Sequence, residues 1–176
     1  MKNKKIILEK LAPFLSPLTI DKGAKLLDEG QIARKLFFVQ KGCMRQFIRK
    51  EGVEITVQFF LEGDSVSSAE SFRTASPSEF IIESIEPTNL LYITRTKLLE
   101  TVKNSPELKH CIEDHIFDQF LHYQNLFLSR IMNSPQERYN NLMLNQPELI
   151  KRIPQKYLAS YLGITPVSLS RIRNRR

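Results

Sequence analysis

The feature that most constrains the fold is the stretch QKYLASYLGITPVSLSRI, which covers residues 155–172. Counted from Gln155, the fifth residue is the small Ala159 and the ninth is Gly163. In a helix-turn-helix the fifth position must be small because the two helices cross there, and a glycine at the ninth permits the turn between them. The other constrained positions are all apolar, and they hold Leu158, Leu162, Ile164, Leu169 and Ile172. We therefore predict two short helices that pack against each other across this turn.

Thr165 and Pro166 mark the start of the second helix. Threonine is a favourable N-cap and proline suits the first helical position, so the helix is predicted to begin at Pro166. In this motif the first part of the second helix lies in the major groove of DNA. Arg171 is the best candidate for a bidentate contact to guanine, with a phosphate contact as the alternative, and Val167 suits a thymine methyl group. The residues that we predict to contact DNA are Gln155, Thr165, Val167, Ser168, Ser170, Arg171, Arg173 and Asn174.

The charge of the chain is concentrated at the same end. From residue 151 onward there are seven basic residues and no acidic one. These seven belong to the 26 Lys and Arg of the chain, so residues 1–150 hold 19 basic and 19 acidic residues. The formal net charge of +7 therefore lies in the final segment, as expected of a nucleic-acid-binding end on a neutral body. A solvated basic tail is the alternative.

The first half of the chain has the pattern of an antiparallel β-sheet protein. A short helix over residues 6–15 is predicted to end at Ser16-Pro17. Segments rich in Phe, Val, Ile and Thr then recur at short spacing and are separated by turn residues. The predicted strands cover residues 36–39, 44–48, 53–60, 80–85 and 90–93. Regular strands with glycine-containing turns predict an α+β protein with an N-terminal antiparallel β-sandwich or jelly roll and flanking helices.

Helical patterns follow the strands. A helical stretch covers residues 97–102, and Ser105-Pro106 opens a longer helix that runs to residue 132. The apolar residues of the longer helix are spaced by threes and fours over more than one face. A helix of this length spans about 39 Å, more than a small sandwich can cover, so we expect part of it to pack against a second copy of the chain. The residues predicted to lie in this dimer interface are Ile112, Ile116, Phe120, Tyr123 and Phe127.

The sequence SPQE, from Ser134 to Glu137, has the pattern of a capping box with proline at the first helical position. One helix is therefore predicted to end here and another to begin. We place the domain boundary at this break, between a sensor domain over residues 1–133 and a small all-α helix-turn-helix domain over residues 134–176. A short helix to about residue 145 and a turn at Gln146-Pro147 are predicted before the DNA-reading helices.

Other classes of function lack the residues that they need. No apolar run approaches the roughly 18 to 20 residues of a membrane span, so a cytoplasmic protein with no membrane partner is expected. The chain has only two cysteines, Cys43 and Cys111, and they are far apart in the sequence. They therefore indicate neither a disulfide framework nor an iron–sulfur cluster. His110, His115 and His122 all lie on the long helix, which leaves the strands without the imidazole ligands of a cupin enzyme. No catalytic residue, metal site or cofactor is therefore predicted.

Three segments, FFVQKGCMRQF, GVEITVQFFLEGD and IPQKYLASYLGITPVSLSRIR, resemble the bacterial Crp/Fnr family of transcription regulators. With the order of sandwich, long helix and helix-turn-helix, the resemblance covers nearly the whole chain. It implies a cyclic-nucleotide-binding-like sandwich, a dimer seam along the long helix, and an effector that reorients the C-terminal domains on DNA. A two-stranded wing usually follows the motif in this family. It is missing here, so we expect a wingless reader, or one cut short, in which Arg173, Arg175 and Arg176 take over the backbone contacts.

The resemblance does not extend to the residues that bind a cyclic nucleotide. Members that bind one use a Gly-Glu pair after the Gly-Asp equivalent to Gly63-Asp64, and later an Arg-Ser or Arg-Thr pair for the phosphate. The corresponding positions here hold Ser67-Ser68 and Ser78-Glu79, and Glu79 would repel a phosphate. Cyclic AMP is therefore not expected to bind, and the serine-rich stretch is either a pocket for another ligand or a polar loop. The residues of this candidate effector pocket are Val66, Ser67, Ser68, Arg73, Ser78 and Glu79.

These patterns favour a homodimeric, sequence-specific DNA-binding regulator that does not respond to cyclic AMP. A twofold dimer predicts an inverted-repeat operator on double-stranded DNA, with half-sites about 10 bp apart or a multiple of this spacing. RNA polymerase and an unknown small-molecule effector are further candidate partners. One alternative is a ligand-sensing or interaction module whose basic end binds polyanions without sequence preference. A cupin-like enzyme is the other, and it would need a bound metal.

Overall fold

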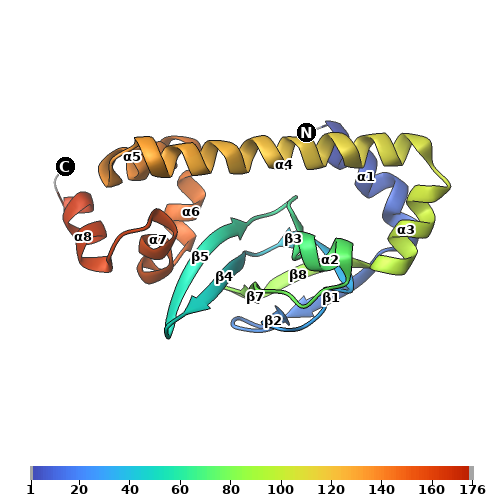
Figure 1. The fold of residues 1–176 in the computed structure, drawn as a ribbon, viewed down its shortest axis with the longest axis horizontal. Helices are drawn as coiled ribbons and strands as arrows, with labels where there is room; N and C mark the ends of the chain where they lie inside the picture. The colour runs from blue at the N-terminus through green and yellow to red at the C-terminus, as the bar shows by residue number, and fades with distance from the viewer. Residues whose placement is uncertain (1, 175–176) are drawn as a thin grey trace.

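Two antiparallel four-stranded sheets form the first part of the computed structural model, which describes residues 2–174 (Figure 1). One sheet has the order β1-β8-β3-β6, with β1 at Ser16–Ile20, β8 at Thr88–Thr94, β3 at Lys35–Lys41 and β6 at Ser65–Val66. The other has the order β2-β7-β4-β5, with β2 at Lys25–Leu27, β7 at Ile81–Ser84, β4 at Met44–Lys50 and β5 at Val53–Phe60. The predicted α+β fold with an antiparallel sandwich is confirmed.

Three strands escaped the sequence-based prediction. Ser16-Pro17 was expected to end a helix, but both residues belong to β1. Proline is tolerated there because β1 is an edge strand, whose outward N–H positions need no partner. The short strands β2 and β6, with three and two residues, are too brief to show an alternating pattern.

The core of the sandwich lies between the sheets, where Val39, Phe60, Ile82 and Leu90 are buried. The turn from β3 to β4 passes close to the start of β8. A Cβ atom at Gly42 would lie 2.5 Å from Thr88 Oγ1, and the φ angle of Gly42 is +114°. A residue without a side chain is therefore required at this turn.

Helices α1 (Lys2–Leu11) and α3 (Arg95–Lys103) flank the sandwich at the end where α4 begins, and a short 3₁₀ turn, η1 (Ala12–Phe14), follows α1. The helix predicted over residues 6–15 thus starts earlier and ends at Leu11. Leu11 is fully buried with Leu108 of α4 in one hydrophobic cluster. Lys10 Nζ lies 2.5 Å from Glu107 Oε2. The first turns of α4 are therefore covered by the chain itself.

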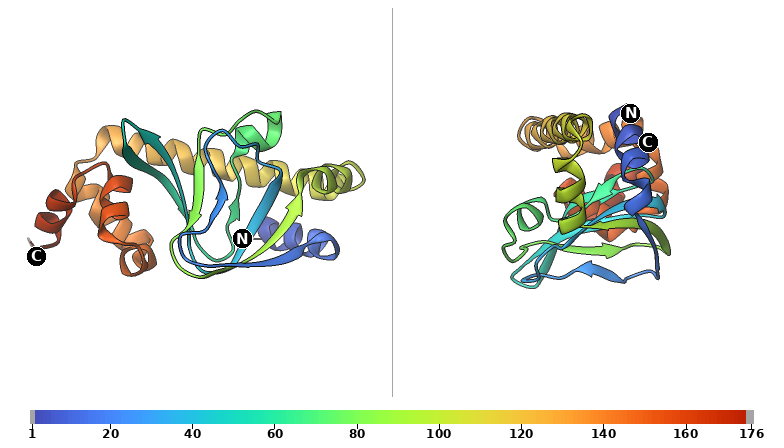
Figure 2. Two further views of the ribbon diagram at one scale, coloured as in Figure 1. Left: turned by 90° about the horizontal axis from the view of Figure 1, so that it is seen from below. Right: turned by 90° about the vertical axis from the view of Figure 1, so that its right-hand side faces the viewer.

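Helix α4 (Pro106–Met132) has the predicted bounds and runs above the sandwich along the length of the molecule (Figures 1 and 2). Ser105 caps it by accepting a hydrogen bond from the Leu108 N–H. Beyond Asn133 the chain forms α5 (Pro135–Asn145), and Ser134 and Glu137 make the predicted capping box. In residues 2–174, no helix combines the length and the apolarity that crossing a membrane requires.

Four further helices complete the fold. Helix α2 (Ala69–Thr74) lies between β6 and β7, and α6 (Pro147–Arg152) follows α5. The pair α7 (Gln155–Leu162) and α8 (Pro166–Asn174) ends the described chain. Residues 146–147 were predicted to form a turn, but Pro147 is the first residue of α6, where its missing N–H costs nothing. The C-terminal helices lie beyond one end of the sandwich, under the last turns of α4 and α5 (Figure 1).

Candidate nucleic-acid interface

Helices α7 and α8 pack together through the small residue that the sequence pattern requires. Ala159 is fully buried, and Leu158 and Leu169 are 1% and 0% exposed. Gly163 ends α7 in the left-handed conformation, with φ of 69°. The N–H of Ile164 then donates to the Ala159 carbonyl over 3.0 Å, which closes the turn. The predicted helix-turn-helix geometry is therefore present.

Thr165 fixes the start of α8. Its Oγ1 accepts a hydrogen bond of 3.1 Å from the Ser168 N–H, and its carbonyl accepts one of 3.0 Å from the Leu169 N–H. Thr165 is thus the N-cap and Pro166 the first helical residue, as predicted. The beginning of α8 is held rigidly by the backbone, which suits a helix that must enter a groove in a fixed orientation.

The outer face of α8 is exposed to solvent in the part of the chain that the structure describes. Val167 is 61% exposed, and Thr165, Arg171, Arg173 and Asn174 are also exposed. Ser168 and Ser170 are half-buried. Gln155, at the start of α7, donates a hydrogen bond of 3.2 Å to the Pro166 carbonyl and so lies beside the start of α8. The structure therefore brings the eight predicted residues to one end of the molecule. Arg175 and Arg176, the other predicted backbone contacts, lie outside the described residues.

Two arginines that the sequence reasoning missed hold the C-terminal end of α7. Arg130 of α4 donates through Nη2 to the Tyr161 carbonyl over 2.8 Å. Arg138 of α5 donates through Nε to the Leu162 carbonyl over 3.1 Å. Cations are favourable at this end of a helix because its last carbonyls are unpaired and carry partial negative charge. These bonds connect α7 to the long helix and to α5.

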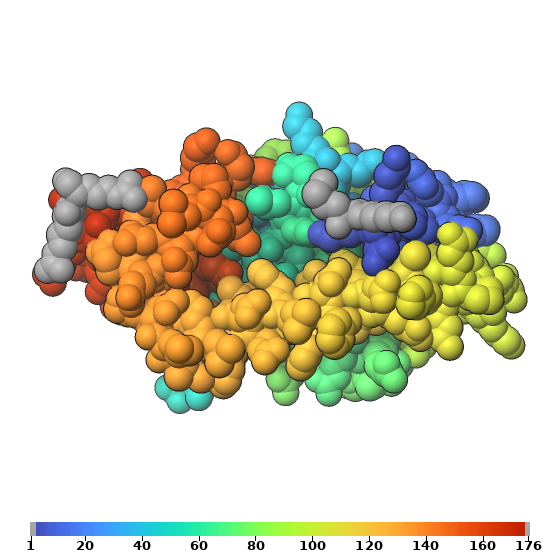
Figure 3. Space-filling view, turned by 90° about the horizontal axis from the view of Figure 1, so that it is seen from above, coloured from blue at the N-terminus to red at the C-terminus, as the bar shows by residue number. Residues whose placement is uncertain are grey.

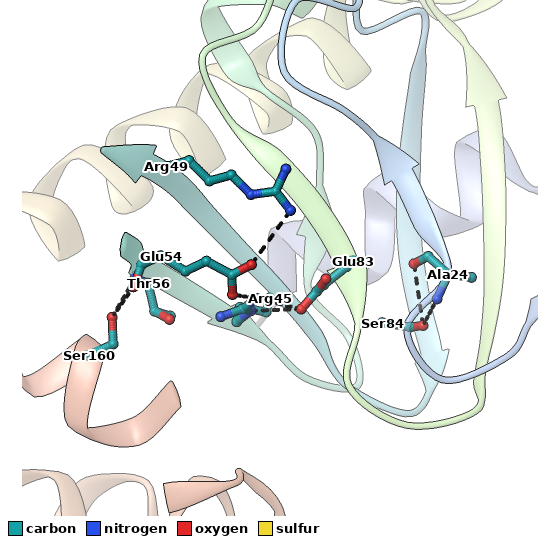
Figure 4. A network of polar contacts seen from close by, with 8 residues as sticks. All are labelled: Ala24, Arg45, Arg49, Glu54, Thr56, Glu83, Ser84 and Ser160. Carbon is teal, nitrogen blue, oxygen red and sulfur yellow. Dashed lines mark hydrogen bonds and ion pairs between the residues drawn. The ribbon is translucent and has the colours of Figure 1, made fainter. Parts of the chain in front are cut away.

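The other side of α7 binds the edge of the sandwich. Ser160 Oγ accepts a hydrogen bond from the Thr56 N–H and donates one to the Glu54 carbonyl, each over 2.9 Å (Figure 4). Strand β5 is an edge strand, and its outward backbone groups would otherwise be unpaired. One hydroxyl thus satisfies a donor and an acceptor of this edge. Nothing in the local pattern of α7 distinguishes Ser160 from a solvent-facing serine.

Arg45 is the second link between the sandwich and α7. Its side chain is 1% exposed, and its guanidinium contacts Glu83 Oε1 at 2.5 Å and Glu54 Oε2 at 2.7 Å (Figure 4). The same group lies 3.7 Å from the ring centre of Tyr157 in α7. Partial burial raises the pKa of Glu54, but the hydrogen bond and charge of Arg45 outweigh it, so this pKa is lowered. Arg45 is therefore a buried cation that is shared by two carboxylates and an aromatic ring of the helix-turn-helix.

Arg152 links α6 to the sandwich. It binds Glu62 through two hydrogen bonds of 2.8 and 2.9 Å, and it also pairs with Glu86. The hydrogen bond from Arg152 lowers the pKa of Glu62 to about 2. Lys151 pairs with Glu148 over 3.0 Å. Two of the seven basic residues of the C-terminal segment are thus paired within the protein, so the charge that faces solvent is smaller than the sequence count suggests.

The predicted dimer face divides into two groups. Ile116, Phe120 and Phe127 are 59%, 60% and 64% exposed. Ile112, in contrast, packs against the cluster between α1 and α4. Tyr123 is 41% exposed, but its hydroxyl donates a hydrogen bond to Gln58 Oε1 of β5. More large apolar side chains of α4 are exposed beside the first group, namely Phe117, Leu121, Leu128, Ile131 and Met132.

The predicted effector residues surround α2. Val66, Ser68 and Ser78 are buried, whereas Arg73 and Glu79 are exposed. Ser67 donates to the Lys35 carbonyl over 3.1 Å, and Ser78 donates to the Phe80 carbonyl over 2.9 Å. Ser67 is therefore bonded to the first residue of β3 and Ser78 to its own loop, so both hydroxyls already have partners.

Neither of the two described cavities includes any of the six effector residues. Arg95 closes the C-terminal end of α2 by donating to the carbonyls of Phe72 and Arg73, over 2.5 and 2.8 Å. In the part of the chain that the structure describes, no three His, Cys, Asp or Glu side chains are grouped so that they could hold a metal ion. Burial raises the pKa of the Cys43 thiol to about 12, which keeps it protonated.

Comparison with known proteins gives the same architecture. Residues 17–105 match the cyclic nucleotide-binding domain family. The structure of the c-di-GMP-responsive global regulator CLP from Xanthomonas campestris has a TM-score of 0.77 at 14% identity, over 97% of this chain and 90% of that one. FixK2 from Bradyrhizobium japonicum has a TM-score of 0.77 at 18% identity, over 92% and 83% of the chains. A protein from Eubacterium rectale assigned to the Crp/Fnr transcriptional regulators has a TM-score of 0.74 at 18% identity, over 95% and 80%. No curated protein sequence matches the chain significantly.

Proposed function

Because the chain belongs to the cyclic nucleotide-binding domain family and has the fold of the Crp/Fnr regulators, we propose that it is a homodimeric transcriptional regulator. It reads an inverted-repeat site on double-stranded DNA. The observation that carries this proposal is the outer face of α8, which begins at a rigid cap and is free of contacts with the described chain. Residues 1–133 form the sensor and residues 134–176 the DNA-binding domain of a cytoplasmic protein, with RNA polymerase as a further partner.

The dimer forms along α4 from residue 116 onward. Ile116, Phe120 and Phe127 expose more than half of their surface in the single chain and lie on one face of the helix. Exposed apolar patches of this kind indicate protein contacts. A parallel partner helix would bury this face and place the two α8 helices on one side of the dimer, as an inverted repeat requires.

Within α8, Arg171 is the base-reading residue. Arg171 is exposed and forms no ion pair with residues 2–174, so two N–H groups of its guanidinium are available for a bidentate contact to guanine. Val167 contacts a thymine methyl group from the preceding turn. Gln155, Ser168, Ser170 and Arg173 contact phosphates around it.

Cyclic AMP is not the effector. The hydroxyls of Ser67 and Ser78 already donate to the carbonyls of Lys35 and Phe80, and the exposed carboxylate of Glu79 directly follows Ser78, at the position that would face a phosphate. Calorimetric titration with cyclic AMP and cyclic GMP is expected to show no micromolar binding. Such binding would show that the loop is still a nucleotide site.

DNA binding is tested by selecting sequences from a pool of random duplexes on the purified protein. We expect enrichment of an inverted repeat whose half-sites are spaced by about 10 bp or a multiple of it. Arg171→Ala is expected to relax the preference at one base pair per half-site, at a cost of about 1–3 kcal/mol.

Arg173→Ala is the matched control, because it lies on the same helix and removes the same charge. It should weaken all sequences alike and reduce the salt dependence of binding. If no sequence is enriched and unrelated DNA competes equally well, the basic end binds polyanions without preference, and the regulator proposal is wrong.

A further inference from the structure

A cavity of about 620 Å³ lies where the sensor and the helix-turn-helix meet. It is bordered by Val57 of β5, by α4 from His122 to Arg130, and by residues of α5 and α7. Figure 3 shows a hollow beside α4, between α5 and the sandwich. The volume is that of a site for a small organic ligand. The cavity shares no residue with the loop around α2 that family members use for their nucleotide.

The charge of the lining is positive. Arg130, Arg138 and His122 contribute to the wall, and no aspartate or glutamate lines the cavity. Arg130 uses Nη2 for the Tyr161 carbonyl, and Arg138 uses Nε and Nη1 for the carbonyls of Leu162 and Asn133. Each guanidinium therefore keeps N–H groups that have no partner in the described chain. A ligand that carries negative charge would find two fixed cations and no repelling carboxylate.

Amide side chains form the rest of the polar wall. Asn125, Asn141, Asn145 and Gln146 line the cavity, and their side chains form no hydrogen bond with residues 2–174. Each amide offers two donors and an acceptor. The apolar wall contains the rings of Tyr123, Phe127 and Tyr161, together with Leu126 and Leu142. Rings of this kind pack well against a planar aromatic group.

We propose that this cavity binds an organic anion with one or two aromatic rings, whose charge contacts Arg130 and Arg138 and whose rings lie against Tyr123 and Tyr161. The amides of α5 select its polar substituents. Both arginines are already held in place by α7, so the site is preorganised and binding needs little rearrangement.

The site also has a regulatory consequence, which rests on the proposed function. Its walls belong to α4, which carries the dimer face, and to α5 and α7 of the DNA-binding domain. A bound anion would therefore couple the position of α7 to the long helix. If the bound anion changes the affinity of the protein for DNA by some factor, then bound DNA must change the affinity of the protein for the anion by the same factor.

The site is tested by titrating the full-length protein with 8-anilinonaphthalene-1-sulfonate, an aromatic anion whose fluorescence rises on binding. We expect saturable binding at one site per chain. N-phenyl-1-naphthylamine has the same ring system without the sulfonate and should bind at least about tenfold more weakly, because it cannot use the arginines.

Asn141→Asp places a carboxylate in the cavity wall and should weaken binding of the sulfonate by about tenfold or more. Asn140→Asp is the matched control, because it makes the same change on α5 but lies outside this cavity, where its oxygen can still accept from Gln136. Asn145→Asp provides a second variant of the cavity wall, so the test does not depend on the folding of one protein. Equal binding by both cavity variants and the control, or equal binding of the uncharged probe, would overturn the proposal.

The coupling between the cavity and DNA binding is tested with the inverted-repeat DNA selected above. At a concentration that saturates the wild type, 8-anilinonaphthalene-1-sulfonate is expected to change the DNA concentration needed for half-maximal DNA binding severalfold in the wild type but not in Asn141→Asp. If the probe binds in the cavity and DNA affinity stays constant, the site stands and its coupling to DNA is rejected. If the protein binds no specific DNA while the probe still binds in the cavity, only the proposed regulator function fails.

Discussion

The exposed face of α4 and the contact between α7 and the sandwich have opposite chemistry. On α4, Ile116, Phe120 and Phe127 leave 59–64% of their surface uncovered. At the other contact, Ser160 makes directional hydrogen bonds of 2.9 Å with two backbone groups of β5, and the Arg45 guanidinium lies 3.7 Å from the ring centre of Tyr157. Apolar burial has no preferred direction and needs only another apolar surface, whereas polar contacts fix an orientation. The first surface therefore suits assembly with a second copy, and the second sets how the helix-turn-helix sits on its own sensor.

The largest effect is expected from Arg45→Ala. This change leaves Glu83, whose side chain is 14% exposed, as a buried carboxylate without its cation. The free energy of unfolding should fall by about 3–5 kcal/mol, measured by urea denaturation. Arg49→Ala is the control. Its side chain is 46% exposed and lies 3.6 Å from Glu54, so its loss should cost less than about 1 kcal/mol. Equal losses in both variants would show that the buried pair has no special role.

Phe120→Asp tests the apolar surface. The carboxylate would face its own copy in the dimer seam, so the dissociation constant of the dimer should rise by about 100-fold, or nearly 3 kcal/mol. Sedimentation equilibrium measures this change. Leu144→Asp on α5 is the control, because it also replaces an apolar residue that is 80% exposed but lies outside the seam. A dimer that is unaffected by Phe120→Asp would place the interface elsewhere.

Ser160→Ala tests the polar contact at one atom. Thr56 is buried, and the change leaves its N–H and the Glu54 carbonyl without their partner. The expected cost is about 1–2 kcal/mol in the free energy of unfolding. Ser170→Ala, which removes the hydroxyl of a half-buried serine in α8, should leave stability nearly unchanged. If both variants have the same stability, Ser160 does not hold α7 on β5.

The smallest effect is expected from pH. Arg152 holds the pKa of Glu62 at about 2 in the folded protein, below its ordinary value of 4.5. Stability from this pair is therefore present above about pH 4.5 and is lost as the pH falls toward 2. Glu62 is 42% exposed, so the loss should remain below about 1 kcal/mol. Urea midpoints over this range should fall less in Arg152→Ala than in the wild type. Parallel curves would show that Glu62 stabilises nothing through Arg152.

The features that could be predicted from the sequence depend on neighbours along the chain. The crossing at Ala159, the turn at Gly163 and the cap at Thr165 all lie within residues 155–172, so the spacing of residues along this short segment shows them directly. The bounds of α4 follow in the same way from Ser105-Pro106 at one end and Ser134-Pro135 at the other. The two-residue strand β6 has no pattern long enough to detect, and in β1 the proline at position 17 argues against a strand.

The contacts that fix α7 on the sensor could not be predicted, because they join distant parts of the chain. Ser160 and Thr56 are 104 residues apart in the sequence, and Arg45, which stacks on Tyr157 of α7, belongs to strand β4 of the sandwich. The role of Arg152 changed for the same reason. In the sequence it belonged to a basic DNA-binding end, but in the fold it lies beside Glu62 and Glu86 of the sandwich.

The sequence by itself determined a sandwich, a long helix and a capped helix-turn-helix, because each follows from local spacing and helix or strand propensity. Only the tertiary structure decided which charges are paired, which apolar face of α4 stays uncovered, and that amides and arginines of α4 and α5 meet around one cavity. Those properties depend on distances between segments that the chain brings together only when it folds.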